Sequence, residues 1–147
     1  SQGRVERFRS FMTGEVFSLL AGQSVLRLTI DAARPDPAAL AEAGAEALAD
    51  PHAAQSGLFP LRAAALLQGL APERAAGRLS GLLIGAELAA ARDFWQDGPT
   101  AIIGAPDLAR LYETLLLAAG AQACHKDGTA LVLAGLAAAS LDLPEDT

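Results

Sequence analysis

The fold class is decided by the stretch Thr100-Ala101-Ile102-Ile103-Gly104-Ala105-Pro106-Asp107, near the C-terminal end of the chain. It begins with residues typical of a short buried strand, and Pro106 favours the first turn of a helix. We expect that helix over 106–119, a second strand over 121–125 and a closing helix over 128–141. Strand, helix, strand and helix in this order predict a parallel pair of strands in an α/β fold.

The residues upstream of this unit are predicted to be largely helical, so the fold class is a helix-rich α/β protein. Apolar residues at helical spacing, with start and stop residues, place helices over 13–22, 37–49, 57–70 and 72–95. The helix over 37–49 has Asp36 as its expected N-cap. It is mostly alanine, so we expect it to lie at the periphery of the fold.

A segment near the start of the chain predicts a strand. Polar and apolar residues alternate over 3–9, but a strand needs a partner, and a hairpin partner would normally precede it. The single methionine is Met12, so the sequence has no initiator. From both observations we expect this sequence to be part of a longer protein.

Composition and charge exclude several classes of protein. The net charge is −6 and Lys126 is the single lysine, so we expect no nucleic-acid partner, which would need clustered basic residues. The most apolar stretch, 129–141, is shorter than the ~20 residues of a bilayer span, so we expect no membrane association. The lone Cys124 and the lack of a secretory signal favour a cytoplasmic location.

The loop after the first predicted strand is a candidate binding site. Gly104, Ala105 and Pro106 lie where ligands bind in open α/β sheets, at the carboxyl end of a strand and the N-terminus of a helix. Gly104 would permit close approach of a flat ligand. The spacing is neither a Walker A loop nor Gly-x-Gly-x-x-Gly, and an ordinary tight turn is the alternative.

Two other candidates lie on predicted helices. The stretch Thr13-Gly14-Glu15 offers a hydroxyl, free backbone donors and a carboxylate at a helix start. It would hold a phosphate or a sugar hydroxyl, or it is a plain cap formed by Thr13. Gly81 and Gly85 share one face of a helix, which serves either helix packing or one wall of a ligand slot.

Charged residues and histidines give weaker signals. Arg62 is the one charge in an apolar segment, and it either pairs with a carboxylate or holds an anionic substrate. His52 and His125 lack metal-ligand spacing, so we expect no metal site built by this chain. Cys124 and His125 are neighbours on a predicted strand, so they point to opposite faces and do not form a nucleophile–base pair.

Three segments, taken together, resemble one known family. The first runs from Gly3-Arg4-Val5 through Met12-Thr13-Gly14-Glu15-Val16-Phe17 to Ser24-Val25-Leu26. The second is Ser80-Gly81-Leu82-Leu83-Ile84-Gly85-Ala86-Glu87 with Arg92-Asp93 behind it, and the third is Gly104 to Leu108 with Leu111-Tyr112 and Gly120. In this order they resemble the 2-dehydro-3-deoxygalactonokinase family, and residues 59–63 match a fourth, weaker segment. Gln23 departs from the family, whose members usually carry histidine there.

The resemblance implies an ATP-dependent sugar-acid kinase with the two-domain fold of the actin, hexokinase and Hsp70-like ATPases. Such a kinase transfers the γ-phosphoryl group of ATP to the 6-hydroxyl of 2-dehydro-3-deoxy-D-galactonate, in bacterial galactonate breakdown. The family's Asp-x-Gly-Thr-Thr phosphate loop and its Pro-Gly-Thr-His-(Ser/Thr)-Lys-Trp segment are absent. Residues 1–147 would therefore form the C-terminal, nucleotide-side domain alone.

The resemblance also implies roles for individual residues. Gly104, Ala105 and Pro106 would border the adenosine, Ser80, Gly81 and Ile84 would form the opposite wall, and Thr13, Gly14 and Glu15 would face the phosphates. A missing N-terminal domain would supply the sugar site, most Mg²⁺ ligands and the catalytic base, so this chain alone is expected to be inactive.

Homodimer formation stays open. The alternatives to this kinase are a non-catalytic helical interaction domain and an actin-like ATPase domain with another substrate.

Overall fold

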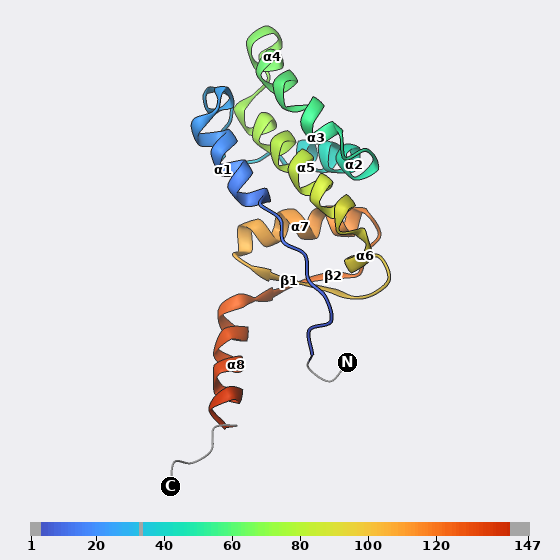
Figure 1. Cartoon of the computed structure of the whole chain (residues 1–147). Coiled ribbons are helices and arrows are strands. Elements are labelled where there is room, and N and C mark those ends of the chain that lie inside the picture. Colours follow the sequence, from blue (N-terminus) through green and yellow to red (C-terminus); the bar gives the residue numbers. More distant parts are fainter. Residues whose placement is uncertain (1–3, 33, 142–147) are drawn as a thin grey trace. The chain divides into compact units, whose positions relative to one another are not determined.

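The structure, a computed structural model, describes residues 4–32 and 34–141 (Figure 1). We expected residues 1–147 to form a single domain. By its contacts the chain divides into two compact units, Ser1–Asp97 and Gly98–Thr147, and its role as one nucleotide-side domain stays a prediction. The described part of the first unit is helical, and the strands of the described residues belong to the second.

The first unit consists of helices joined by short loops. They are α1 (Thr13–Gln23), the 3₁₀ turn η1 (Val25–Leu28), α2 (Pro37–Ala49), α3 (Ala53–Ser56), α4 (Leu58–Gln68), α5 (Pro72–Ala90) and α6 (Arg92–Trp95). The helix predicted over 72–95 is interrupted at Ala91, where α5 ends and α6 begins. The other helix predictions for this unit are confirmed to within a few residues.

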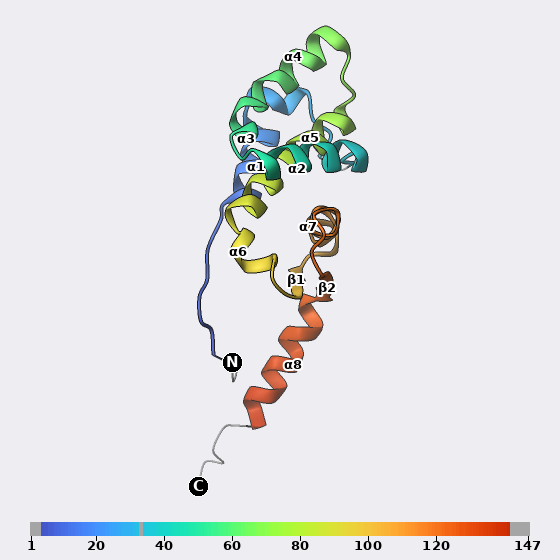
Figure 2. The same ribbon diagram turned by 90° about the vertical axis from the view of Figure 1, so that its right-hand side faces the viewer.

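The helix α2 packs along α5 (Figure 2). Its inner side consists of small residues, and Ala39, Ala43 and Ala47 are each 0% exposed. The expectation that this helix is peripheral is wrong. We inferred it from the scarcity of large apolar side chains, but small side chains are what allow the two helix backbones to approach one another at the density of a protein interior.

A second group of buried residues joins elements that are distant in sequence. Leu26 of η1, Leu61 of α4 and Leu79 of α5 form one core cluster. None of the residues of α1 is buried, but Phe17 and Leu20 pack against this cluster from outside. The helix α1 therefore lies on the surface of the core that it helps to cover.

The two predicted helix caps have different outcomes. Asp36 is confirmed, because its Oδ1 accepts a hydrogen bond of 2.7 Å from the backbone N–H of Ala39. The prediction that Thr13 is an N-cap is wrong. It lies inside the first turn of α1, and Met12 occupies the cap position without a side-chain hydrogen bond.

The start of the described chain is extended and exposed. Residues 4–12 adopt no regular secondary structure, so the strand predicted over 3–9 is wrong for its described residues, 4–9; Gly3 lies outside them. Alternation of side chains is not sufficient for a strand, because strand backbone groups need a neighbouring strand. The two strands of the described residues pair with each other instead.

The second unit has the predicted order of elements: β1 (Thr100–Gly104), α7 (Pro106–Ala118), β2 (Ala123–Asp127) and α8 (Gly128–Leu141). The strands are parallel, and their register places Thr100 opposite Ala123 and Gly104 opposite Asp127. The predicted strand–helix–strand unit is therefore confirmed.

The strand β2 begins two residues later than predicted because the end of α7 uses those residues. Gly120 has a φ of +81°, which glycine adopts without steric cost. The N–H of Ala121 donates to the carbonyl of Leu116 at 2.9 Å, and the N–H of Gly120 donates to the carbonyl of Leu117 at 3.0 Å. This Schellman arrangement satisfies the last carbonyls of the helix.

Within the second unit, the described residues cover one face of the strand pair. The helix α7 packs against both strands through buried residues that include Ala109 and Leu115, whereas Ile103 is 61% exposed. The expectation that the first strand is buried is therefore wrong. The helix α8 leads away from the end of β2 (Figure 2). Among the described residues, no helix combines the length and apolar character needed to cross a bilayer.

Candidate functional site

A hollow of about 270 Å³ lies in the second unit at the carboxyl end of β1. Its lining residues are Ile102, Ile103, Gly104, Leu108, Ala109 and Tyr112. Five of them are apolar, and Tyr112 adds an aromatic ring with a polar end. The hollow therefore suits a flat, largely apolar group that carries polar atoms at its edge.

The hollow exists because a strand ends where a helix begins. Gly104 closes β1 and has open space where a Cβ would lie, while Ala105 is the N-cap of α7 and Pro106 its first residue. Leu108 and Tyr112 are four residues apart on α7, so they lie on one face of the helix. The structure thus places Gly104 of the predicted loop in the lining of a hollow, and contact of Ala105 and Pro106 with a nucleotide stays a prediction.

Tyr112 was not among the predicted site residues. The resemblance included it only as part of a matching segment. The sequence signal that could have found Tyr112 is its four-residue spacing from Leu108. This spacing places both side chains on the same face of the helix that follows the loop of Gly104.

His125 also lies beside the loop. Its Nε2 is 3.3 Å from the carbonyl oxygen of Gly104, and its backbone N–H donates to Oε1 of Glu113 at 3.3 Å. The side chains of His125 and its neighbour Cys124 differ in exposure, as expected on a strand, and Cys124 is exposed. His125 therefore links β2 to the end of β1 and to α7.

The predicted opposite wall lies in the first unit, on α5. Ser80 is 4% and Ile84 is 3% exposed. A Cβ on Gly81 would overlap with the carbonyl oxygen of Leu40 and lie 2.8 Å from the nitrogen of Gly44. For Gly81 the structure therefore favours helix packing over a ligand slot. Contact of these residues with a nucleotide stays a prediction.

The start of α1 is accessible. Gly14 and Glu15 are exposed, and Thr13 is half-buried. The hydroxyl of Ser18 donates to the carbonyl oxygen of Gly14 at 2.9 Å, one turn away. The structure gives Thr13 no capping role, and a role of this stretch beside phosphates stays a prediction.

Arg62 contacts the first unit's interior. Its guanidinium donates to the hydroxyl of Thr29 at 3.2 Å, and Thr29 is 3% exposed. This contact gives a buried hydroxyl a hydrogen-bond partner. We had considered only a carboxylate partner or an anionic substrate for Arg62, so this contact was not predicted.

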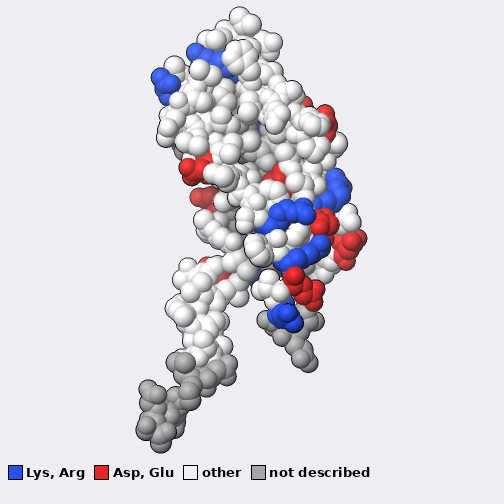
Figure 3. Space-filling view, in the orientation of Figure 1, with Lys and Arg blue, Asp and Glu red and all other residues white. Residues whose placement is uncertain are grey.

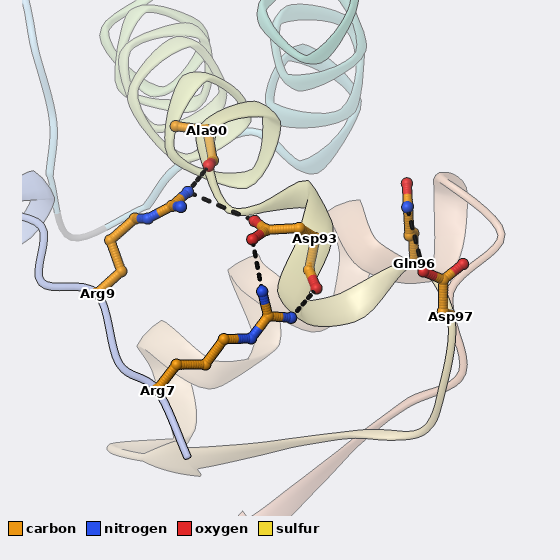
Figure 4. A network of polar contacts seen from close by, with 6 residues as sticks. All are labelled: Arg7, Arg9, Ala90, Asp93, Gln96 and Asp97. Atoms are coloured by element: carbon orange, nitrogen blue, oxygen red, sulfur yellow. Dashed lines mark hydrogen bonds and ion pairs between the residues drawn. The ribbon is translucent and has the colours of Figure 1, made fainter. Parts of the chain in front are cut away.

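Charged side chains gather at the end of α5 and on α6 (Figures 3 and 4). Arg7 donates to Oδ2 of Asp93 at 2.7 Å and also to the carbonyl oxygen of Asp93. Arg9 donates to the carbonyl oxygen of Ala90 and lies 3.4 Å from Oδ1 of Asp93. Both guanidinium groups also lie over the ring of Phe94, at 4.3 and 5.2 Å from its centroid.

We call Arg7, Arg9, Asp93 and Phe94 the arginine clamp. It fixes the extended start of the chain against α6. Asp93 lies in a segment that resembles the family, but no role was predicted for it, because its partners are more than eighty positions away in sequence.

A larger hollow of about 400 Å³ lies in the first unit between α4 and the pair α2 and α5. Its two arginines are already paired, Arg74 with Glu42 at 3.2 Å and Arg78 with Glu46 at 3.1 Å. Since these charges balance, we assign no ligand to it. The described residues contain no group of three or more His, Cys, Asp or Glu side chains that could hold a metal ion.

Comparison with known proteins identifies the relatives of this chain. A family model described as 2-keto-3-deoxy-galactonokinase matches residues 1–139. A probable 2-dehydro-3-deoxygalactonokinase of Rhizobium meliloti (strain 1021) is 37% identical over 142 residues, which are 93% of this chain and 46% of the relative. A crystal structure of a candidate 2-dehydro-3-deoxygalactonokinase from Sinorhizobium meliloti matches with a TM-score of 0.81 and 35% identity, over 93% of this chain and 47% of that chain.

These matches define a class of proteins, the sugar kinases, to which the matched relatives belong by name. The chain belongs to the 2-keto-3-deoxy-galactonokinase family, whose model covers nearly all of it. The family predicted from the three sequence segments is therefore confirmed. The chain spans about half the length of the relatives it matches.

Proposed function

We propose that this chain is the C-terminal, nucleotide-binding part of an ATP-dependent sugar-acid kinase. In the full-length protein, the kinase would transfer the γ-phosphoryl group of ATP to the 6-hydroxyl of 2-dehydro-3-deoxy-D-galactonate, giving ADP and the 6-phosphate. The observation that carries the proposal is the family match over residues 1–139. The names of the relatives supply the substrate class.

We assign the purine base of ATP to the hollow at the end of β1. Ligand pockets usually have volumes of about 300–1,000 Å³. A volume of about 270 Å³ therefore suits one planar group rather than a whole nucleotide. The apolar lining would contact the faces of the base, and the ring of Tyr112 would stack on it.

The contribution of this chain to the reaction would be positioning. Phosphoryl transfer depends mainly on the alignment of the nucleotide with the acceptor and on charge stabilisation at the phosphates. Gly104 would let the loop approach the adenosine, and Pro106 would fix where α7 begins. The rest of the kinase would supply the sugar site, the catalytic base and the charge at the phosphates.

A kinase of this kind uses Mg²⁺ together with ATP, and the ion neutralises charge at the phosphates. The described residues do not fit a magnesium site of their own, because they contain no cluster of carboxylates. We therefore assign no step of the reaction to a metal ion held by this chain.

The binding of ADP to the chain tests the proposal. In a titration of the ¹⁵N-labelled chain with millimolar ADP, the amides of Gly104, Ala105 and Tyr112 are expected to shift. Loss of a stacked aromatic costs about 1–3 kcal/mol, so Tyr112→Ala should weaken binding by about tenfold or more. Phe59→Ala is the control, since Phe59 is an aromatic of the first unit that is 72% exposed.

Two results would contradict the assignment. One is the absence of shifts at the loop amides at millimolar ADP. The other is an equal loss of affinity in Tyr112→Ala and Phe59→Ala, which would show that the hollow has no special part in binding.

A further inference from the structure

The helix α8 carries no charged residue along its whole length, Gly128–Leu141. All of its side chains from 129 to 140 are exposed. The large ones are Leu131 at 43%, Val132 at 62%, Leu133 at 63% and Leu136 at 63%. Three of these residues are consecutive, so they point to different sides of the helix. A helix that is apolar on all sides is normally buried.

The open face of the strand pair, which also carries the exposed Lys126 opposite Ile103, borders this apolar surface. Ile103 is 61% exposed, and Cys124 on the neighbouring strand is also exposed. A Cβ on Gly128 would lie 3.6 Å from Cγ2 of Ile103, so the first residue of α8 borders the open face. Parallel strands are normally covered on both faces. Two independent features of the second unit thus require a covering element.

Observations on the chain and its relatives indicate what covers this surface. The family match runs to residue 139 and therefore includes α8, so this helix is part of the kinase fold. The relatives contain about as much chain again as the part that matches.

We propose that Cys124, Leu131, Val132, Leu133 and Leu136 form a docking surface for the other half of the kinase. The occupant is the part of a 2-keto-3-deoxy-galactonokinase chain to which this sequence has no counterpart. This inference rests on the proposed function, since it takes the full-length kinase as the assembly. We call these five residues the α8 surface.

Thiol labelling tests the α8 surface in a full-length chain. The unmatched half of the Rhizobium meliloti relative is joined to this 147-residue chain in the relative's order, with its own cysteines replaced by serine. Cys124 is the only cysteine of this chain and serves as the probe on the strands. Leu136→Cys in a Cys124→Ser background is the probe on α8, and maleimide is the reagent.

Both probes are expected to react at least tenfold more slowly in the full-length chain than in the 147-residue chain. The matched control is Leu67→Cys in the same Cys124→Ser background. Leu67 is an 83% exposed leucine of α4, and its labelling rate should change less than twofold. Equal rates for Cys124 and Leu136→Cys in both chains would overturn the proposal.

Labelling of the 147-residue chain at several concentrations distinguishes the other possible occupants of the α8 surface. If protection of Leu136→Cys grows with its concentration, a second copy covers the surface and the proposal is wrong. If protection is present at every concentration, the chain's own residues cover it, which also overturns the proposal.

The labelling needs neither nucleotide nor sugar acid, so it is independent of the proposed activity. A full-length chain with protected thiols and no kinase activity would contradict the proposed function and leave the docking surface in place. An active chain with freely labelled thiols would contradict the docking surface alone.

Discussion

Gly81 and Gly85 set the distance between α5 and α2. A Cβ on Gly85 would lie 2.5 Å from the carbonyl oxygen of Gly44, and one on Gly81 would overlap with that of Leu40. Each obstacle is backbone, which cannot rotate away as a side chain can. Glycine inside a helix costs roughly 1 kcal/mol relative to alanine. The packing of α2 against α5 is the gain that offsets this cost.

Gly81→Ala is therefore predicted to destabilise the first unit. The better helix propensity of alanine is worth up to about 1 kcal/mol, but overpacking of a core costs about 1–3 kcal/mol and forces α2 to move. A net loss of about 1–2 kcal/mol is expected in urea unfolding. Gly14→Ala is the control, since nothing lies within 4 Å of its Cβ position. A Gly81→Ala variant as stable as the parent would contradict this account of the helix pair.

Asp93 is predicted to hold the start of the chain through the arginine clamp. In Asp93→Asn, Arg7 and Arg9 lose the carboxylate that lies between them, and trypsin should cleave after both arginines at least threefold faster. The side chains are about half exposed, so the change in global stability should stay below about 1 kcal/mol.

Asp97→Asn is the matched control for the clamp. This variant also removes one carboxylate charge close to the clamp. Asp97 accepts a hydrogen bond of 3.2 Å from Gln96 and contacts neither arginine in Figure 4. Equal cleavage rates in Asp93→Asn and the parent chain would show that the clamp does not restrain residues 4–12.

At the scale of elements, the two candidate caps give opposite predictions. Asp36→Ala removes the side-chain acceptor for the N–H of Ala39, and loss of such a cap costs about 1 kcal/mol. Thr13→Ala removes no capping bond, so its effect should stay within about 0.5 kcal/mol. Urea unfolding of both variants checks this difference. A larger loss in Thr13→Ala than in Asp36→Ala would restore the cap predicted from the sequence.

The sequence was sufficient to predict most helices and the parallel strand pair. The signals were local in these cases: Asp36 before a proline, Gly120 after an apolar helix, and two short apolar runs on either side of α7. Each of them acts within a few residues, through a cap, a positive φ or the period of the side chains. Local signals of this kind are readable without knowledge of the tertiary structure.

The wrong predictions depended on partners that lie far away in sequence. The burial of α2 follows from two glycines about forty residues downstream on α5. The strand predicted over 3–9 failed because pairing requires a neighbour, and its arginines contact Asp93 instead. Of the candidate site, the loop at Gly104 was predicted, whereas Tyr112 was not, because its place depends on how α7 lies against β1.

At the scale of the whole molecule, apolar surface explains the unusual composition. The residues are 52% hydrophobic, yet large apolar side chains remain exposed along α8. A protein of this size normally covers most such side chains, and large exposed apolar patches mark interaction sites. The chain spans about half the length of its relatives. Its composition is therefore the composition expected of one part of a larger assembly.

Kinase activity is predicted to require the other half of that assembly. Positioning of two reactants contributes about 7–11 kcal/mol to catalysis, and the sugar site is assigned outside this chain. The 147-residue chain should therefore phosphorylate 2-dehydro-3-deoxy-D-galactonate at least roughly a thousandfold more slowly than the full-length chimera. A coupled assay of ADP release measures both, and Leu67→Lys in the chimera, on the exposed side of α4, is a control expected to keep its rate. Comparable rates with and without the other half would place the substrate site within residues 1–147 and overturn the division of roles proposed for the two halves.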